Sequence, residues 1–297
     1  MKRGGGSDKS LGMSENPDRN EFDLEYQRVV KDILQNGTEE TNKRTGHKTR
    51  VLPGAYFEVD NGFPLLSLRK IPIRIFVAEM IWYVMGSRMP AEFLQQYTRI
   101  WDDFTNINGV VTTSYGYRWR RHFGRDQLGE LVKLLKTDPT SRHGVVVTWD
   151  PADDGLANSL TVRKKMNIPC PFTFVVNITN KKLNMFSVSR STDMILGCPH
   201  DVAGFALLQR ILAAHLGYGT GKFVFTTANA HIYDIHYAAA EELVRRKSRQ
   251  KEIKLKGEAN WLARAERGDD KLVGEIVGKL ESQYTPGEPI KGLKIVI

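Results

Sequence analysis

The stretch DVAGFALLQRILAAHLGYG, residues Asp201–Gly219, is apolar around most of its helical circumference and predicts a long central helix. Strand-like sequence lies on both sides of it. FTFVVNITNKKLNMFSVSRST at 172–192 predicts a hairpin that turns at 179–181, and KFVFTTANAHIY at 222–233 predicts a further strand. Helices and strands mix here without the regular alternation of a doubly wound sheet. The sequence therefore predicts an α+β fold.

Further helices surround this centre. Helical spacing of apolar residues recurs at 20–36, at 129–139 and at 234–246. RIFVAEMIWYVMG at 74–86 is apolar nearly all round and predicts a buried helix that ends at Gly86. Glu79 lies in the middle of that helix, which makes it a candidate buried acid.

Bulk composition bounds the class of protein. With 297 residues and 41% hydrophobic composition, the chain has material for a substantial core. Residues 1–20 are polar and rich in glycine and serine, so we expect a flexible tail followed by one domain over 21–297. No apolar run approaches the roughly 20 residues that a membrane helix needs. Only Cys170 and Cys198 are cysteines, which argues against a disulfide framework and suits a cytoplasmic protein.

The net charge of +9 fits either nucleic-acid binding or anionic small substrates. The densest basic run is RRKSRQKEIKLKGEANW at 245–261, and it lacks interleaved aromatic residues on which bases could stack. We therefore expect it to be an exposed helix or loop, and we expect no nucleic-acid partner.

Cys170 stands between two prolines immediately before a predicted strand. It is either a small buried hydrophobe or a nucleophile, and a nucleophile needs nearby positive charge to favour the thiolate. Arg190, on the second arm of the same hairpin region, could supply that charge. Cys198 has no activating context, so we expect it to be a packing residue.

Three arginines lie in separate contexts rich in serine, threonine and glycine: Arg44, Arg142, and Arg190 with Ser191 after it. Guanidinium groups match phosphate oxygens and hydroxyls complete the shell, so together they indicate a phosphate site, although each alone could be a surface arginine. His231 and Tyr233 are two apart and share one strand face. Such a pair either hydrogen-bonds a sugar hydroxyl or is structural.

A series of segments in collinear order resembles the thymidylate synthase family and covers nearly the whole chain after the tail. In order, the segments are RTG (44–46), FPLLSLRK (63–70), EMIWYVMG (79–86), IWDDFTNINGVVTTSYGYRWR (100–120), DQL (126–128), SRHGVVVTW (141–149), IPC (168–170), SRSTD (189–193), LGCPHDVAGFALL (196–208), AHIY (230–233) and YTPGEPIKGLKIVI (284–297). The resemblance implies a mixed sheet packed against helices, with one sheet face forming a homodimer interface.

The resemblance also implies a reaction. Cys170 matches the nucleophile that adds to carbon 6 of a pyrimidine nucleotide, after which carbon 5 attacks the methylene of the co-substrate 5,10-methylenetetrahydrofolate. No metal is expected. The other implied roles are phosphate binding by Arg44, Arg190 and Ser191, and by Arg142 from the other subunit; sugar binding by His231 and Tyr233; contacts near pyrimidine and folate by Asp193; proton transfer by Glu79 and Tyr115; folate binding by Trp101; and closure over the folate by the C-terminal segment.

Asp201 departs from the synthase pattern, which has asparagine at this position. Uracil offers a ring N–H and a carbonyl, which an amide complements. Cytosine offers an amino group and an unprotonated ring nitrogen 3, so a carboxylate accepts from the amino group and favours protonation of nitrogen 3. A mispaired uracil contact would cost roughly 1–3 kcal/mol. Alternatively, Asp201 is only the N-cap of the helix that follows.

An aspartate at this position resembles the cytidylate hydroxymethylases. Two further departures are Pro171, where the family has histidine, and His200, where synthases have an aromatic residue; His200 could contact the base or set the charge of Asp201. We therefore predict a one-carbon transferase that converts dCMP (or CMP), methylenetetrahydrofolate and water to the 5-hydroxymethyl nucleotide and tetrahydrofolate. The alternatives are a dUMP-using synthase or hydroxymethylase and, in another class, a non-catalytic RNA-binding protein.

Overall fold

The computed structural model describes residues 20–155 and 168–296 of the chain. All but the last residue of the predicted tail at 1–20 lies outside the described residues. Among the described helices, none is long and apolar enough to span a membrane.

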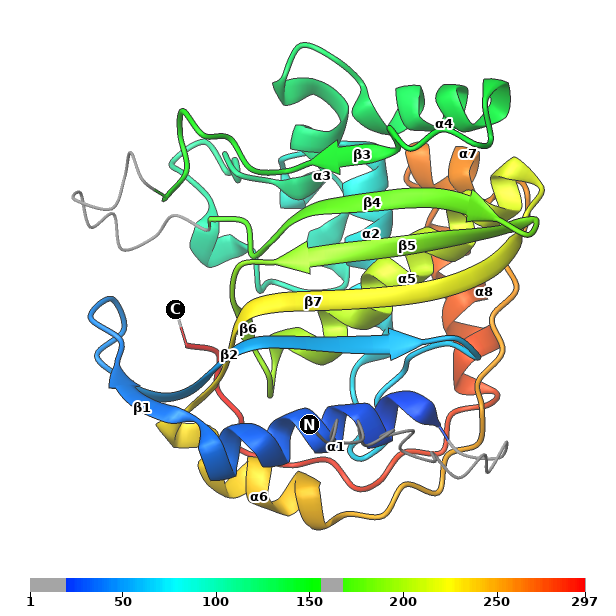
Figure 1. The fold of residues 1–297 in the computed structure, drawn as a ribbon. Helices are drawn as coiled ribbons and strands as arrows, with labels where there is room; N and C mark the ends of the chain where they lie inside the picture. Colours follow the sequence, from blue (N-terminus) through cyan, green and yellow to red (C-terminus); the bar gives the residue numbers. More distant parts are fainter. Residues whose placement is uncertain (1–19, 156–167, 297) are drawn as a thin grey trace, which may run out of the picture.

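A seven-stranded mixed sheet forms the centre of the molecule (Figure 1). Its strand order is β1-β2-β7-β5-β4-β3, and β6 pairs with β7 beyond the end of β5. β5 and β6 run parallel to β7, and the remaining pairs are antiparallel. The strands are β1 (Thr38–Thr41), β2 (Lys48–Val59), β3 (Val145–Val147), β4 (Pro171–Thr179), β5 (Lys182–Ser189), β6 (Thr192–Asp193) and β7 (Gly219–Tyr233).

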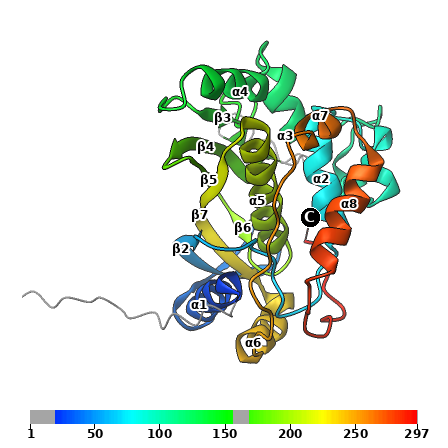
Figure 2. The same cartoon turned by 90° about the vertical axis from the view of Figure 1, so that its right-hand side faces the viewer.

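Helices cover one side of this sheet (Figure 2). α5 (Gly197–Leu216) packs on β5 and β7, and α2 (Ile73–Met85) packs on α5. The other helices are α1 (Glu21–Asn36), α3 (Tyr115–Tyr117), α4 (Gln127–Thr137), α6 (Tyr237–Arg245), α7 (Trp261–Glu266) and α8 (Asp270–Glu281). α1 contacts β2 and α4 contacts β3, so these two helices lie at opposite edges of the sheet. The predicted α+β class is confirmed.

The predicted helices at 20–36 and 74–86 are confirmed as α1 and α2. Gly86 ends α2 with a φ of 70°, the left-handed conformation that glycine adopts without strain. The predicted hairpin is also confirmed, since β4 and β5 flank Asn180 and Lys181, which have φ values of 50° and 58°. The basic run at 245–261 is mostly irregular between α6 and α7, although Ile253 and Leu255 in it are buried.

The central helix starts earlier than predicted, at Gly197 rather than at Asp201. Two local features explain the difference. The Asp193 carboxylate accepts hydrogen bonds from the backbone N–H groups of Ile195 (2.9 Å) and Leu196 (3.3 Å), which holds the turn just before the helix. Pro199 then lies in the first turn, where a missing N–H costs no hydrogen bond.

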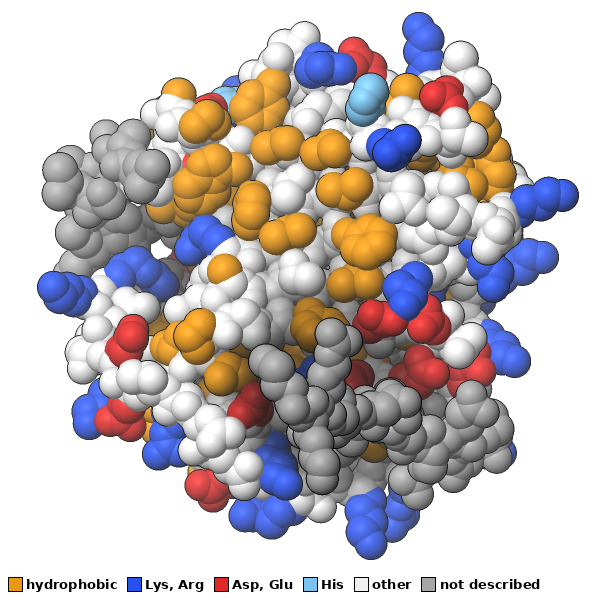
Figure 3. Space-filling model, in the orientation of Figure 1, with side chains coloured by type: hydrophobic (Ala, Val, Ile, Leu, Met, Phe, Trp, Pro, Cys, Tyr) orange, Lys and Arg blue, Asp and Glu red, His pale blue; other side chains and the backbone are white. Residues whose placement is uncertain are grey.

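The opposite side of the sheet is open in the described structure, and hydrophobic side chains gather on it (Figure 3). The strand register aligns Val145, Val175, Phe186 and Val224 in one row across β3, β4, β5 and β7. Val145 is 47% exposed, although valine is a residue that proteins usually bury. This open apolar face extends over four strands.

Candidate active site

Cys170 immediately precedes β4, Arg190 immediately follows β5, and the two residues are in contact. The backbone N–H of Arg190 donates to the Cys170 carbonyl at 2.9 Å. The Arg190 guanidinium donates to the carbonyls of Pro169 (2.9 Å) and Ile168 (2.8 Å), and its Nη2 lies 3.6 Å from the Cys170 sulfur. The predicted positive charge beside the thiol is therefore present, and the carbonyl contacts fix its position.

Several polar residues of the site lie at the break between β5 and β6. Both strands pair with β7 in the same register, and the two residues between them, Arg190 and Ser191, interrupt the pairing near the end of β7. Asp193 then pairs with His231 in the parallel register. Ser191 Oγ lies 3.4 Å from His231 Nδ1, which is also 3.0 Å from Asn229 Oδ1.

His231 and Tyr233 share one strand face, as predicted, and their ring centroids are 5.0 Å apart. Burial lowers the pKa of His231, which keeps the imidazole neutral at neutral pH. Arg44 is exposed in the loop between β1 and β2 and hydrogen-bonds the Tyr233 side chain. The structure therefore places Arg44, Arg190, Ser191, His231 and Tyr233 in one region.

Burial raises the pKa of the Cys170 thiol, and the Arg190 guanidinium opposes this increase more than any other charge. Arg44 opposes it as well, whereas the carboxyls of Asp201 and Asp193 add to it. Without a bound ligand, Cys170 is therefore mainly in its thiol form. A nucleophilic attack by the sulfur must be accompanied by removal of its proton.

An aromatic wall faces the cysteine from α2 and α3. The Tyr115 hydroxyl accepts a hydrogen bond from the Cys170 backbone N–H at 2.9 Å. The Tyr115 ring lies 6.1 Å from Trp101, whose indole N–H donates to the Glu79 carboxylate. α3 approaches α2 this closely because residue 116 is glycine: a Cβ there would lie 2.1 Å from the Tyr83 carbonyl oxygen.

Burial raises the pKa of Glu79 to about 7, and the hydrogen bond from Trp101 only partly offsets this effect. The acid therefore changes charge near neutral pH, which is the property required of a group that accepts and returns a proton there. The acid that the sequence predicts to be buried is half-buried in the structure.

Replacing Glu79 with glutamine is expected to stabilise the protein in a pH-dependent way. Because the native pKa exceeds the unfolded value of 4.5, the native state binds this proton more tightly, and wild-type stability falls as pH rises from 4.5 to 7. The Glu79→Gln variant lacks this loss. Its unfolding free energy should exceed the wild-type value by up to about 3 kcal/mol at pH 8 and show no such gain at pH 4. Urea unfolding of both proteins at the two pH values measures this difference, and a pH-independent difference would contradict the assignment.

Asp201 lies in the second turn of α5, five residues into the helix, and is not its N-cap. The N-cap is Leu196, so the alternative that Asp201 only caps the helix is wrong. Within the described residues, the Asp201 carboxyl makes no hydrogen bond or ion pair. Burial raises its pKa well above the ordinary value, and the nearby carboxyls of Glu79 and Asp193 raise it further.

His200 precedes Asp201 and contacts Phe76 edge to face, with ring centroids 6.4 Å apart. Burial lowers the pKa of His200 to about 4. A neutral imidazole cannot supply a positive charge to Asp201, so the idea that His200 sets the charge of that acid is not supported. Contact of His200 with a base remains a prediction.

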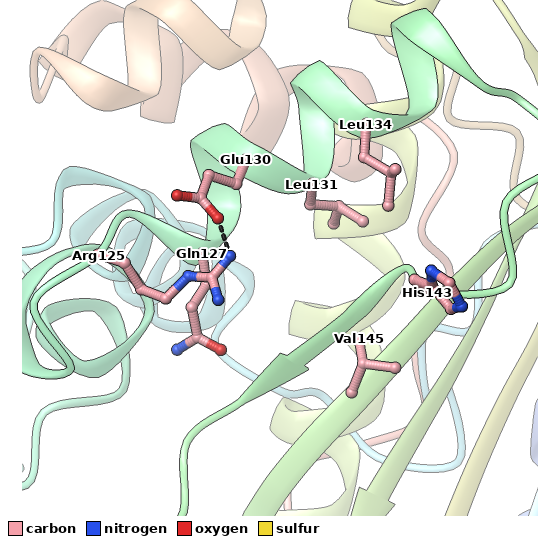
Figure 4. Close-up of a pocket in the computed structure, with 7 residues that line it drawn as sticks. All are labelled: Arg125, Gln127, Glu130, Leu131, Leu134, His143 and Val145. Carbon is pink, nitrogen blue, oxygen red and sulfur yellow. Dashed lines mark hydrogen bonds and ion pairs between the residues drawn. The ribbon is translucent and has the colours of Figure 1, made fainter.

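Arg142 lies apart from the residues around Cys170. It is exposed in the loop between α4 and β3, and no described contact joins it to Cys170 or Arg190. A pocket of about 380 Å³ lies beside this loop, between α4 and β3 (Figure 4). Its lining consists of Arg125, Gln127, Glu130, Leu131, Leu134, His143 and Val145. No predicted site residue lines this pocket, so it is separate from the site around Cys170.

Cys198 is fully buried in α5, as expected for a packing residue. Sequence reasoning missed two residues that the structure adds to the site. Asn229 bonds His231, and the strand alternation of 229, 231 and 233 could have identified it. Tyr83 contacts Tyr115 and Trp101, and its spacing of four residues from Glu79 on one helix could have identified it.

One cluster of possible metal ligands lies elsewhere among the described residues. Ligand atoms of His122, Asp150 and Asp153 lie within 4.8 Å of one another. His122 Nε2 and Asp150 Oδ2 already contact each other at 2.6 Å. None of the three belongs to the site around Cys170.

The thymidylate synthase family model matches residues 24–274. The match runs from within α1 to the first part of α8 and contains every residue of the site around Cys170.

Proposed function

The chain belongs to the thymidylate synthase family, and we propose that it transfers a hydroxymethyl group to carbon 5 of a cytidylate. The family performs one-carbon transfer to a pyrimidine nucleotide with methylenetetrahydrofolate as co-substrate. The proposed reaction converts dCMP (or CMP), methylenetetrahydrofolate and water to the 5-hydroxymethyl nucleotide and tetrahydrofolate.

The observation that carries the choice of cytosine is the state of Asp201. Its carboxyl has no partner among the described residues and has no capping role, and burial raises its pKa well above the ordinary value. A carboxyl with a raised pKa favours sharing a proton with cytosine nitrogen 3 while it accepts from the amino group, which gives a charge-assisted pair about twice as strong as a neutral one. Pairing with uracil would leave both partners neutral. Protonation at nitrogen 3 also makes carbon 6 more electrophilic, so one contact recognises and activates the base.

The remaining residues suit the proposed steps. Cys170 would add to carbon 6, and Arg190 beside the sulfur stabilises the thiolate as its proton leaves. Tyr115, held against the Cys170 backbone, would assist removal of the carbon 5 proton. The folate supplies the one-carbon unit, and the rings of Trp101 and Phe104 beside Glu79 fit its flat ring system.

Phosphate and sugar contacts are proposed for the cluster around β7. Arg44 and Arg190 would bind phosphate with the Ser191 hydroxyl, and His231 with Tyr233 would bind a sugar hydroxyl. Their proximity in the structure supports a shared ligand. The serine and the sugar pair resemble a deoxynucleotide pattern, which favours dCMP over CMP.

The active unit is proposed to be a homodimer formed through the open apolar face. Val145 borders this face and lies three residues after Arg142, which is exposed and distant from its own site. A two-fold related copy on this face would bring the Arg142 of each subunit toward the site of the other. This arrangement explains why a predicted phosphate ligand lies outside the cluster in a single chain.

The function is tested by incubating the protein with dCMP, CMP and dUMP separately, each with methylenetetrahydrofolate, and identifying products by mass. We expect 5-hydroxymethyl product from a cytidylate, and tetrahydrofolate rather than dihydrofolate. Preferred turnover of dUMP would contradict the proposal and favour a uridylate enzyme. RNA binding at physiological salt without turnover of any nucleotide would favour a non-catalytic protein.

A further inference from the structure

Tyr83 borders the site although the steps above do not use it. It lies one turn after Glu79 on α2, so both side chains project from the same face of that helix. Its ring centroid is 5.1 Å from that of Tyr115 and 6.2 Å from that of Trp101. The close approach of Gly116 to the Tyr83 carbonyl holds the two tyrosines together.

The Tyr83 hydroxyl points toward polar groups of the site but bonds none of them. The residue is only 8% exposed, and within the described part of the chain its hydroxyl has no hydrogen-bond partner but is not fully buried. A hydroxyl that is not fully buried and has no protein partner is free to bind a water molecule. The groups whose charge acts most on it are, in order, Glu79, Tyr115, Asp201 and Cys170. The hydroxyl therefore faces the reacting region.

Hydroxymethyl transfer requires a water molecule in a part of the site that is lined mainly by aromatic side chains. An ordered water in a protein interior needs two to four polar partners. Trp82 and Trp119, which also contact the Tyr83 ring, offer apolar faces on this side. The polar groups that α2 contributes here are the Glu79 carboxylate, the Tyr83 hydroxyl and the Trp82 indole N–H, which is buried without a partner among the described residues.

We propose that Tyr83 is a positioning residue whose hydroxyl holds the attacking water against Glu79. This inference rests on the proposed hydroxymethyl transfer and identifies what directs the reaction to that product. Without a held water, the exocyclic methylene group at carbon 5 has no nucleophile in place.

The step balances without an oxidant or reductant. The water oxygen donates an electron pair to the exocyclic methylene carbon, and one water proton passes to the Glu79 carboxylate. The pair of the methylene double bond moves into the ring, toward carbon 4 and protonated nitrogen 3. It then returns to form the double bond between carbons 5 and 6, and the bond from carbon 6 to the Cys170 sulfur breaks with its pair leaving on sulfur. Tyr83 donates to or accepts from the water and changes no bond.

The test is Tyr83→Phe, which removes the hydroxyl and keeps the ring contacts. The matched control is Tyr237→Phe, because the Tyr237 hydroxyl in α6 also has no partner among the described residues but is buried outside the site. Three rates are measured with a cytidylate: exchange of the carbon 5 hydrogen with solvent, hydroxymethyl product formation, and capture of the methylene group by added 2-mercaptoethanol.

For Tyr83→Phe we expect hydroxymethyl formation to fall at least about tenfold, while hydrogen exchange and the nucleotide KM stay within about twofold of wild type. The fraction captured by 2-mercaptoethanol should rise, because the methylene group waits longer for water. A variant that merely folds poorly would lose exchange and product together. Tyr237→Phe should match wild type in all three.

Two outcomes overturn the inference. Unchanged hydroxymethyl formation in Tyr83→Phe would show that its hydroxyl does not hold the water. A raised KM with unchanged kcat would instead make Tyr83 a contact of the nucleotide. Failure of the proposed function is distinguishable, since the wild-type protein itself would then yield no hydroxymethyl product.

Discussion

Replacing Asp201 with asparagine is expected to lower kcat for cytidylates by about 10³-fold and to raise turnover of dUMP above that of dCMP. Asparagine keeps the size and can turn its amide to hydrogen-bond cytosine, so the KM for dCMP should change much less than kcat. The amide has no proton to give to ring nitrogen 3, and activation of carbon 6 is lost for cytosine. Uracil already carries a hydrogen on nitrogen 3, which the amide oxygen accepts.

The measurement is kcat and KM for dCMP, CMP and dUMP with wild type and with Asp201→Asn. Asp32→Asn makes the same chemical change on the outer side of α1, where Asp32 bonds only Asn36, and should leave the preference unaltered. If Asp201→Asn retains the wild-type preference among the three nucleotides, Asp201 does not choose the base.

Replacing Cys170 with serine is expected to lower turnover by at least about 10⁴-fold. A serine hydroxyl is a much poorer nucleophile than a thiolate, and the Arg190 guanidinium cannot make it ionise at neutral pH. Exchange of the carbon 5 hydrogen should be lost to the same extent, because it requires the bond from sulfur to carbon 6. Measurable exchange in Cys170→Ser would remove the covalent step from the mechanism.

Two controls separate this loss from misfolding. Cys198→Ala changes the other cysteine, which is buried in α5, and should keep turnover. Mixing Cys170→Ser with Arg142→Ala after dissociation and reassociation should restore about one quarter of wild-type activity, since half of the dimers would then contain one intact site of two. No recovery on mixing would contradict the shared site.

Much of the secondary structure could be predicted from the sequence, because helices and turns depend mainly on residues that are close together in the chain. The all-round apolar pattern at 74–86 and the glycine that ends it suffice to predict α2, and the hairpin follows from the turn at Asn180 and Lys181. The start of α5 was misplaced, since it depends on Asp193 bonding two amides ahead of the helix. Because the helix starts earlier, Asp201 is an acid inside the helix and not its N-cap.

The candidate site was predictable only where the motifs resemble a known family. Arg190 was assigned beside the thiol, but the carbonyls of Ile168 and Pro169 that hold it there depend on the path of the chain. The charge states were not predictable either. The raised pKa of Asp201 arises from burial and from the carboxyls of Glu79 and Asp193, and the lowered pKa of His200 arises from burial and from Arg69.

Gly116 sets how this protein can change over evolutionary time. With no side chain at that position, α3 rests directly on the backbone of α2, and any larger residue would collide with the Tyr83 carbonyl. The two segments that carry Glu79, Tyr83 and Tyr115 cannot move apart or slide without losing that contact. New substrate or product preferences must therefore arise from side-chain substitutions on an unchanged backbone. We expect single substitutions at positions 83 and 201 to alter the chemistry and to leave the fold intact.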